Sequence, residues 1–386
     1  MLADLIVGKQ LDDNYRYYYV REPASKRVYT CQIDGDAIST RFADWVETDV
    51  LKLGSAQIKK ITFDNYSIRT ERMPIRQFQE RSKSGQTKNI LAAYRSGPDE
   101  VSVIERLNAP ELPVVNRDSG GTWSLDGGVP AGHELDKEKL DSASSTLSAL
   151  TLVGVRRRPA GLLQLIAKLE KPGENLSDSE AEELQERLSQ LTSRGYYPVR
   201  SQSGALAIHG AEGEIRVACD DGAVYTLRMG DRVMGDEDDL ANATAAAARS
   251  PTTGPTTRPE SGREHRYLFV TVDFDPALLG PEPVAPTTRP TATTRPSIAT
   301  TQPTTMPTDP AWTAYQDKLK EYEKKLTDGQ KRRDELAKKF DEWYYIVAAD
   351  AYGKLKLDRT TLLKVVPTTQ PTTLPALEPL GPTTRP

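Results

Sequence analysis

Three stretches rich in proline and threonine limit how much of this chain can enter a folded core. They are "PTTGPTTRPESG" at residues 251–262, a longer stretch at residues 281–310, and "PTTQPTTLPALEPLGPTTRP" at residues 367–386. Frequent proline removes backbone donors and fixes φ, while threonine adds little apolar bulk. We therefore expect extended, polyproline-like spacers and a disordered tail, although such stretches also serve as ligands for proline-recognition domains.

Charge gives no indication of a nucleic-acid partner. The chain has 51 basic and 55 acidic residues spread along its length, and its formal net charge is -4. Binding to nucleic acids or anionic membranes relies on clustered basic residues, so we expect neither. The 386 residues have room for two or three domains, but only 37% of them are hydrophobic, so the folded part is smaller than the length suggests.

The two cysteines, Cys31 and Cys219, are too few for a disulfide framework and have no metal-ligand spacing. We expect two buried single thiols, and one long-range disulfide is the alternative. The sequence has no run of 18 apolar residues and no signal-peptide pattern at its N-terminus, so we expect no membrane span in this chain.

Short alternating segments between the spacers predict antiparallel strands. "QIKKITFDNYSI" places Ile61 and Phe63 on one side, "VSVIERLNA" continues in the same style, and "GGTWSL" adds a short strand after a Gly-Gly turn. Asp221 and Gly222 predict a hairpin turn. The expected fold class is α+β, with small antiparallel sheets and packed helices in tandem repeated units, joined by disordered Pro/Thr-rich linkers.

Capping signals and apolar spacing predict three shorter helices. Asp136 is the expected N-cap of the first helix. Its apolar face consists of Leu140, Leu147 and Leu150. Residues 159–170 predict a second helix. Ser177 and Glu180 form the expected capping box of a third helix, which ends at Gly195.

The stretch from Trp312 to Val347 has apolar residues at steps of three and four, which predicts one long helical face. Gly329 and Arg333 interrupt that phase and predict a break or a frayed middle. A straight helix here has a length on the order of 45 Å, and it either projects to pair with a protein partner or packs along the sheet. The candidate partner-binding face consists of Trp312, Tyr315, Leu319, Tyr322, Leu326, Leu336 and Phe340, and the phase continues at Trp343 and Val347. The run from Trp343 also favours a strand and turn, followed by a short closing helix or strand.

Two distant segments have a similar pattern, "LIVGKQLDDNYRYYYVRE" near the N-terminus and "VYTLRMGDRVMG" with "HRYLFVTVD" later. Each pairs an apolar strand ending in Gly8 or Gly230 with a strand that begins at Arg16 or Arg266. We expect one hairpin used twice, with its first copy belonging to a unit whose beginning is not in this chain. The first strand would then lie at a sheet edge. Two unrelated hairpins of similar style are the alternative.

The expected domain organisation follows from these signals. It comprises the remainder of a first repeat unit (1–55), a second unit of sheet, helices and hairpin (56–235), a linker (236–264), a strand of the second unit (265–280), a Pro/Thr-rich linker (281–310), the long helix with a closing strand (311–366) and a disordered tail (367–386).

Several of these runs together resemble a known family. "LIVGK...YYVRE...RVYTCQID...FADWVETDVL", the later "GGTWSL" before a helix, and "YTLRMG...RYLFV...WYYIV" are similar to the bacterial envelope family called domain of unknown function 4340, over about 1–235 and 263–366. The resemblance implies a membrane-spanning helix followed by sheet-rich repeats outside the cytoplasm, and for some members an association with transporters similar to those of gliding motility. This chain departs from the pattern because it lacks the anchor and the first half of the leading repeat. The family has no accepted catalytic residues, so the resemblance implies none here.

Reactive constellations are missing from the sequence. His133, His209 and His265 have no metal-ligand spacing, and we expect each in a loop or at a strand edge. A calcium loop starting at Asp34 fails at its ligand positions, and the acidic run at 236–239 is most simply a solvated loop. The sequence has no nucleophile elbow, Walker loop or dinucleotide fingerprint. We therefore expect no cofactor, no metal and no catalytic residues.

These inferences favour a non-catalytic cell-envelope binding or scaffold module, accessory to a transporter-like membrane complex, that binds a protein partner through the helix at 312–347. The family resemblance implies a location on the extracytoplasmic side of the cell membrane, although the chain itself carries no signal or anchor. The alternatives are a hydrolase with an unrecognised active site, and a cytosolic scaffold if Met1 is the true start. A histidine beside a serine or carboxylate in a deep pocket would favour the hydrolase.

Overall fold

The structure of the 386-residue chain is a computed structural model. It describes residues 5–14, 16–23, 25–34, 44, 46–108, 111–158, 162, 177–200, 206–235, 240, 263–286 and 310–366. Outside the described residues lie the spacer at 251–262, most of the spacer at 281–310, the tail at 367–386, the acidic run at 236–239, and the helix predicted at 159–170 except Leu162.

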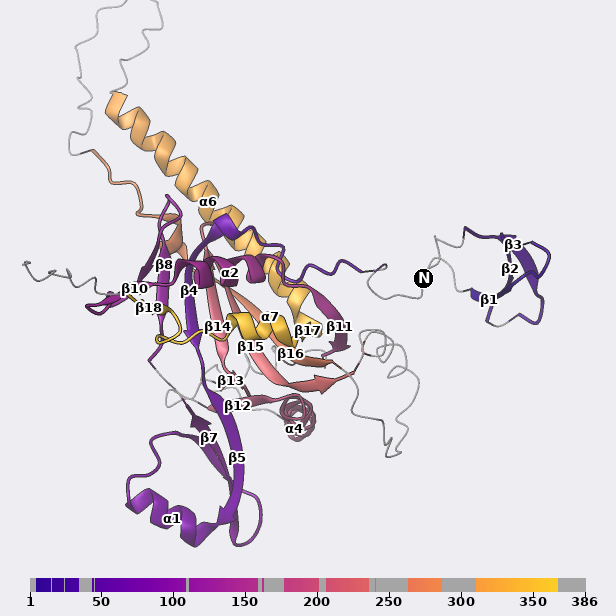
Figure 1. Ribbon diagram of the computed structural model, residues 1–386, viewed down its shortest axis with the longest axis horizontal. Coiled ribbons are helices and arrows are strands. Elements are labelled where there is room, and N and C mark those ends of the chain that lie inside the picture. The colour runs from indigo at the N-terminus through magenta and orange to yellow at the C-terminus, as the bar shows by residue number, and fades with distance from the viewer. Residues whose placement is uncertain are drawn as a thin grey trace, which may run out of the picture.

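An eight-stranded antiparallel sheet forms the centre of the molecule (Figure 1). In sheet order its strands are β11 (Leu152–Arg157), β17 (Trp343–Ala348), β16 (Glu264–Phe274), β15 (Ala223–Met234), β14 (Glu214–Cys219), β4 (Ile58–Asp64), β8 (Val114–Arg117) and β9 (Trp123–Leu125). Strands far apart in sequence are neighbours, because β14 pairs with β4 and β16 pairs with β17. Antiparallel sheets combined with helices confirm the α+β class.

One face of this sheet forms the main hydrophobic core. Ile61 and Phe63 of β4 are fully buried there, as their alternation predicted. The predicted hairpin turn is also confirmed, since Asp221 and Gly222 connect β14 to β15. Gly222 has a φ of +84°, a conformation that glycine adopts without steric cost.

Three helices contribute to this core. They are α2 (Lys137–Ser148), α6 (Pro310–Asp341) and α7 (Ala349–Leu355). Asp136 is the N-cap of α2, as predicted, and its side chain accepts a hydrogen bond from the backbone N of Lys139 at 3.2 Å. Leu140 and Leu147 of α2 are buried, so the predicted apolar face packs inward.

A smaller layer packs on other aromatic residues of the sheet. It consists of α4 (Asp178–Thr192) and the hairpin of β12 (Tyr196–Arg200) and β13 (Leu206–Gly210). Tyr196 stacks on Tyr344 of β17 with ring centroids 5.5 Å apart and an interplanar angle of 9°. The predicted capping box of Ser177 and Glu180 opens α4, and Gly195 follows the helix with a φ of +80°.

The remaining elements are short. They are the sheet β5 (Ser67–Pro74), β7 (Glu100–Leu107) and β6 (Ile90–Arg95) with α1 (Ile75–Lys83), the pair β10 (His133–Leu135) and β18 (Leu363–Val365), and the 3-10 turns η3 (Ser55–Gln57) and η4 (Pro276–Leu279). The sheet with α1 extends away from the central sheet as an arm, at the bottom of Figure 1.

The long helix is continuous, so the predicted break is wrong. α6 runs over 32 residues from Pro310 to Asp341. Gly329 is buried within it, and a Cβ at this position would come within 2.4 Å of the Phe274 ring and 2.8 Å of the Asp221 carbonyl oxygen. Glycine therefore allows α6 to approach the β14–β15 turn closely. The interruption of the apolar phase reflects packing and not fraying.

The helix does not include the last residues of its predicted phase. Trp343 and Val347 lie in β17, which pairs with β11 and β16. The aromatic and β-branched side chains of "WYYIV" favour a strand once neighbouring strands are available for pairing. Arg333 causes no break either, because its guanidinium is partly exposed and lies 3.2 Å from Asp334.

Strands β1 (Ile6–Gln10), β2 (Tyr17–Arg21) and β3 (Tyr29–Gln32) form a separate antiparallel sheet, labelled at the right of Figure 1. β1 lies at its edge, as predicted. Cys31 on β3 is exposed, so the prediction of a buried thiol is wrong for this residue, because nothing in the described chain packs over β3. Cys219 is buried as expected, and both thiols are free.

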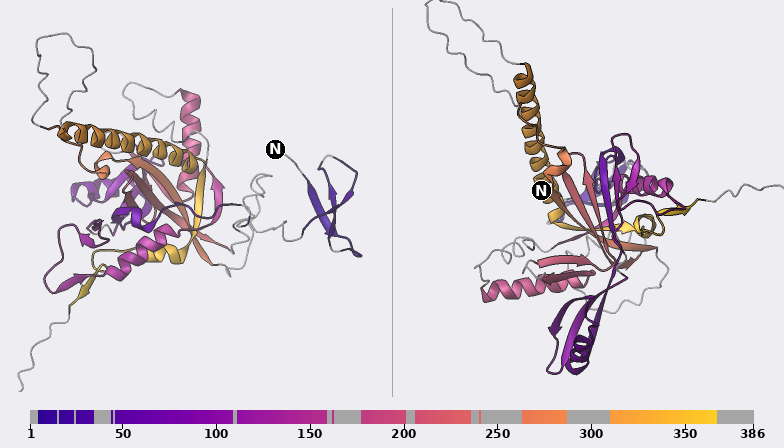
Figure 2. Two further views of the ribbon diagram at one scale, coloured as in Figure 1. Left: turned by 90° about the horizontal axis from the view of Figure 1, so that it is seen from above. Right: turned by 90° about the vertical axis from the view of Figure 1, so that its left-hand side faces the viewer.

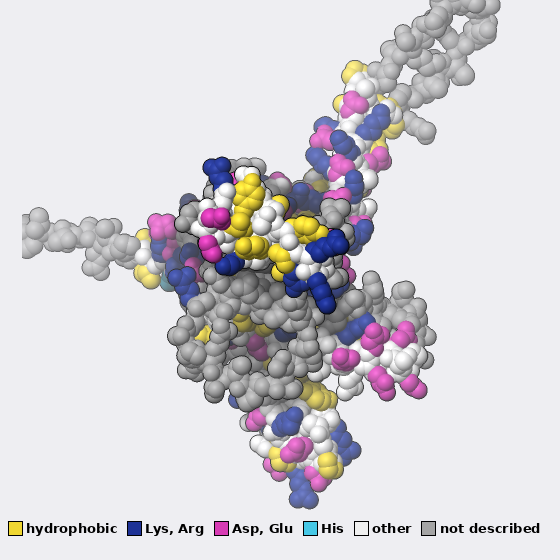
Figure 3. Space-filling view, turned by 90° about the vertical axis from the view of Figure 1, so that its right-hand side faces the viewer, with side chains coloured by type: hydrophobic (Ala, Val, Ile, Leu, Met, Phe, Trp, Pro, Cys, Tyr) yellow, Lys and Arg dark blue, Asp and Glu magenta, His cyan; other side chains and the backbone are white. Residues whose placement is uncertain are grey.

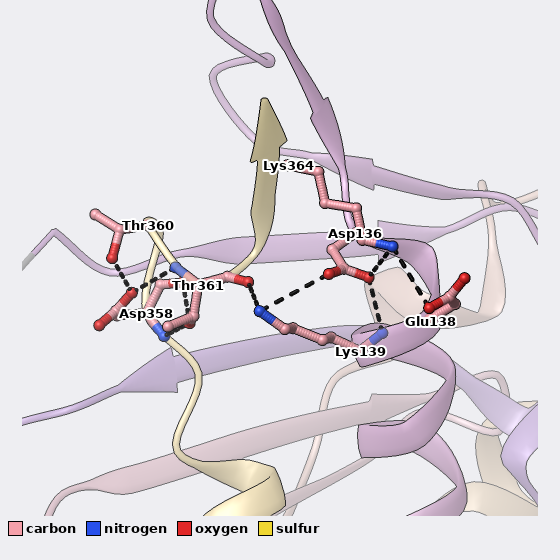
Figure 4. Close-up of polar contacts among 7 residues, drawn as sticks. All are labelled: Asp136, Glu138, Lys139, Asp358, Thr360, Thr361 and Lys364. Carbon is pink, nitrogen blue, oxygen red and sulfur yellow. Dashed lines mark hydrogen bonds and ion pairs between the residues drawn. The ribbon is translucent and has the colours of Figure 1, made fainter. Parts of the chain in front are cut away.

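Polar contacts hold the described C-terminal residues to the start of α2 (Figure 4). Lys364 Nζ lies 3.1 Å from Asp136 Oδ1, and Lys139 Nζ donates to the Thr361 carbonyl at 2.8 Å. Desolvation acts to raise the pKa of Asp136, but the hydrogen bonds from Lys139 and Lys364 outweigh it and lower this pKa. The contacts position β18 beside β10.

Candidate functional site

The N-terminal half of α6 carries an apolar stripe that lies outside the hydrophobic core clusters of the described residues. Figure 2 shows this half projecting beyond the central sheet. The stripe, here called the outer face, consists of Trp312, Tyr315, Leu319, Tyr322 and Leu326, and each is partly exposed. None of these side chains belongs to a hydrophobic core cluster of the described residues. Their spacing alternates three and four, which is the a and d pattern of a coiled coil.

Local interactions stabilise the outer half of α6 as a helix. Glu321 Oε1 lies 2.7 Å from Lys325 Nζ, an i,i+4 pair in the favourable orientation. The hydrogen bond from Lys325 lowers the pKa of Glu321. The rings of Trp312 and Tyr315 also contact each other, with centroids 5.3 Å apart. The outer face is therefore presented on a regular helix.

The remaining two residues of the predicted face lie in the core. Leu336 packs against the main cluster, and Phe340 is 1% exposed within it. The Phe340 ring lies 5.8 Å from the Tyr345 ring and 6.3 Å from the Tyr225 ring. The structure thus divides the predicted face into five accessible residues and two that support the fold.

A partly buried polar cluster, which no sequence pattern predicted, lies where β4 leads into β5. Tyr66 Oη donates to Glu214 Oε1 at 3.0 Å and lies 3.4 Å from His209 Nδ1. Arg228 Nε is 3.4 Å from Glu214 Oε2, and the Arg106 guanidinium lies over the Tyr66 ring at 4.3 Å. A local signal for this cluster does not exist, because Tyr66 and Glu214 are 148 positions apart.

The ionisation of this cluster suits a structural role. Burial raises the pKa of Tyr66 well above its usual range, so the phenol keeps its proton and donates. Burial acts to raise the pKa of Glu214 as well, but the hydrogen bonds from His209 and Tyr66 and the charge of Arg228 outweigh it and lower this pKa. The charged carboxylate is therefore matched by donors from several strands, and the cluster braces the junction of the arm with the central sheet.

A cavity of about 760 Å³ lies between α2, the start of β16 and the start of α7. Its lining includes Ser142, Ser145, Thr146, His265, Asp350 and Lys354. The His265 side chain is 1% exposed, and both of its ring nitrogens are buried without a hydrogen-bond partner in the described part of the chain. The imidazole therefore presents no nitrogen to a ligand in this cavity.

A hydrolase would need a histidine whose ring nitrogen contacts a carboxylate or hydroxyl in a cavity. His265 shares its cavity with Asp350 and Ser142, but neither of its ring nitrogens has a hydrogen-bond partner among the described residues. His209 has a carboxylate neighbour, with Nδ1 at 3.5 Å from Glu214 Oε1, but it does not line the cavity beside His265. His133 is exposed, and its Nδ1 lies 3.2 Å from the Ala131 carbonyl oxygen.

Within the described ranges, no group of three or more His, Cys, Asp or Glu residues is arranged to hold a metal ion. A search of the same residues finds no helix whose length and apolar character would let it cross a bilayer. The outer face of α6 is accordingly the candidate site that the described chain presents most clearly.

Comparison with known proteins identifies a family. No curated protein and no solved structure matches the chain. One family profile, described as Domain of unknown function (DUF4340), matches residues 2–203. That region covers more than half of the 386 residues and includes β1 to β12. The protein therefore belongs to the DUF4340 family.

Proposed function

We propose that this protein is a non-catalytic binding and scaffold module of the bacterial cell envelope that self-associates through the outer face of α6. The observation that carries the proposal is the division of α6, whose inner half packs in the core while its outer half presents an apolar stripe. A stripe of aromatic and leucine side chains on a projecting helix is typical of a helix-pairing surface.

The charges beside the stripe favour a second copy in parallel orientation. If Trp312 occupies position a of a heptad, Lys318 occupies position g and Glu323 the following position e. In a parallel pair these two positions face each other across the interface, so lysine meets glutamate in both directions. In an antiparallel pair g faces g, which brings Lys318 close to Lys325. The occupant that fits is therefore a second copy of this helix, in register and parallel.

We also propose that β1–β3 and β15–β17 are two copies of one three-stranded unit. Residues directly opposite each other form equivalent rows, Val7, Val20 and Tyr29 in the first sheet and Met229, Leu268 and Tyr345 in the second. A second pair of rows is Gln10, Tyr18 and Cys31 with Arg232, Arg266 and Val347. Strand order, direction and register agree in all three strands.

A shared irregularity supports this equivalence. The register of β1 with β2 shifts by one residue between Val7 and Gln10, and that of β15 with β16 shifts at the corresponding place after Met229. Gly8 and Gly230 lie inside the two irregular segments. The equivalence aligns Tyr18 with Arg266, two positions later than the similarity of the Arg-Tyr pairs suggested.

The envelope location and the link to a transporter-like complex are supported by the family resemblance alone. The alternative function, a hydrolase, would be favoured by a histidine and a carboxylate meeting in a cavity. In the described residues, His265 shares a cavity with Asp350, but neither of its ring nitrogens has a hydrogen-bond partner. His209 contacts a carboxylate but does not line that cavity, so the binding role is the function that the geometry supports best.

The proposed self-association is tested with Leu319→Glu in the full chain, measured by sedimentation equilibrium. A charge at the centre of the outer face should weaken dimerisation at least tenfold, because each interface would bury two carboxylates. Ala314→Glu is the matched control, since Ala314 is exposed on α6 outside the stripe, and this variant should dimerise like the parent. Far-ultraviolet circular dichroism checks that both variants are folded. A parent chain that stays monomeric up to high micromolar concentration, or equal behaviour of the two variants, would contradict the proposal.

A further inference from the structure

The sheet of β1–β3 exposes side chains whose equivalents in the central sheet are buried. Figure 3 shows apolar side chains gathered over this sheet. In the row that contains Val20, the outer residues Val7 and Tyr29 are 38% and 57% exposed, while Val20 between them is buried. The equivalent residues Met229 and Tyr345 are only 1% and 4% exposed. The two sheets therefore share a register, and they differ in how far the side chains of their two outer strands are covered.

A helix supplies the cover in the central sheet. Phe340 of α6 lies against the Tyr345 ring with centroids 5.8 Å apart, and Leu336 packs against the same core. α6 lies between β16 and β17 in the chain, so the connection between these two strands itself brings the helix onto the sheet. The corresponding connection between β2 and β3 runs only from residue 22 to residue 28, which leaves no room for a helix that packs back.

From this difference we infer that the face of β1–β3 on which Val7 and Tyr29 are exposed, on either side of the buried Val20, is a docking surface for an amphipathic helix of a partner protein. The inference rests on the repeated unit proposed above. The partner helix presents an aromatic ring and an aliphatic side chain four residues apart, as Phe340 and Leu336 do on α6. Three strands with an apolar face become a stable packing unit when a helix covers that face, and this accounts for the exposure of Tyr29.

The apolar side chains on this face of β1–β3 indicate which kind of partner segment can bind there. Val7 offers an exposed β-branched side chain, and Tyr29 offers a ring for an edge-to-face contact such as the one between Phe340 and Tyr345. A strand adding to the edge of β1 would leave this face uncovered. A helix buries it, so a helical partner fits better than an extended peptide.

The test uses a probe taken from this chain, the peptide of residues 329–342. A lactam between the side chains of Lys331 and Glu335 holds it helical, because these i,i+4 residues are exposed on α6 and lie off the docking side. Fluorescence anisotropy of the labelled peptide is measured against the intact chain carrying Leu319→Glu. This background removes the proposed self-association and keeps the two proposals separate.

We expect saturable binding that Tyr29→Lys weakens at least tenfold. Tyr94→Lys is the matched control, because Tyr94 lies on the arm with a similar exposure of 51%, and it should leave binding unchanged. A peptide with Phe340→Ala should bind at least tenfold more weakly. Both tyrosines are exposed, so neither substitution removes a core residue.

Three outcomes overturn the inference. They are the absence of saturable peptide binding, equal binding by the Tyr29→Lys and Tyr94→Lys chains, and loss of self-association by Tyr29→Lys without the Leu319→Glu change. The last result would identify a second copy as the occupant of this face. If the proposed self-association is wrong, the parent chain is monomeric. Peptide binding to the Leu319→Glu chain does not depend on that result, so the two failures can be distinguished.

Discussion

The two halves of α6 have the same apolar periodicity and different environments. In the inner half, Leu336 and Phe340 lie in the core and Gly329 lies against the β14–β15 turn. In the outer half, the residues from Trp312 to Leu326 are partly exposed on a helix that projects beyond the sheet. Apolar spacing therefore predicts a helix with its apolar residues on one face. The extent of the neighbouring sheet determines which turns of that face are covered.

The largest expected effect is the difference in stability loss between an alanine substitution in the inner half of α6 and one in the outer half. Phe340→Ala should lower the free energy of unfolding by about 3–5 kcal/mol, because it empties a volume enclosed by Tyr225 and Tyr345. Tyr322→Ala in the outer half should lower it by less than about 1 kcal/mol in the monomer, since no core cluster of the described residues includes it. Urea denaturation followed by circular dichroism measures both. Similar losses for the two variants would contradict the distinction between the halves.

The next effect concerns the glycine that interrupts the apolar phase. Gly329→Ala should destabilise the chain by about 1–3 kcal/mol, because the new methyl group meets the Phe274 ring and the backbone carbonyl of Asp221. Gly353→Ala is the control, since Gly353 lies in α7 and no atom lies within 4 Å of the position that its new methyl group would take. This control should be neutral or stabilising by about 0.5–1 kcal/mol, as expected for alanine in a helix. A stabilising Gly329→Ala would contradict the close approach of α6 to Phe274 and Asp221, because the new methyl group would then meet no obstruction.

The smallest effect tests the orientation proposed for the outer half. Lys318→Glu should weaken self-association about threefold to tenfold, because exposed ion pairs contribute about 0.2–1 kcal/mol each and two of them become repulsive. The double variant Lys318→Glu with Glu323→Lys should restore the parent affinity in a parallel dimer. Sedimentation equilibrium at low salt measures the three dissociation constants. A double variant as weak as the single one would point to another arrangement of the helices.

The elements that the sequence predicted correctly depend on short-range signals. The capping box of Ser177 and Glu180, the N-cap at Asp136 and the turn at Asp221 and Gly222 are each formed within a few residues. Their geometry is set by local hydrogen bonds and backbone sterics, so the surroundings change them little.

The failures concern residues whose role depends on distant neighbours. Gly329 looks like a helix breaker until Phe274 and Asp221 are placed beside it. The cluster of Tyr66, His209 and Glu214 joins residues more than 140 positions apart, and no local pattern indicates such a contact. The five residues of the outer face were predicted as an apolar stripe, but only their position beyond the sheet separates them from core residues.

The amino-acid sequence alone was sufficient to establish the α+β class, the helix caps, the hairpin turn and the apolar phase of the long helix, because each of these follows from local propensity and periodicity. Three further outcomes required the assembled fold. The run from Trp343, for which the sequence favoured both a continued helical phase and a strand, becomes β17. Gly329 is a packing residue, and two three-stranded sheets with the same register differ in the exposure of their outer strands. These outcomes depend on which surfaces are available for burial, and burial is a property of the assembled chain and not of any single segment.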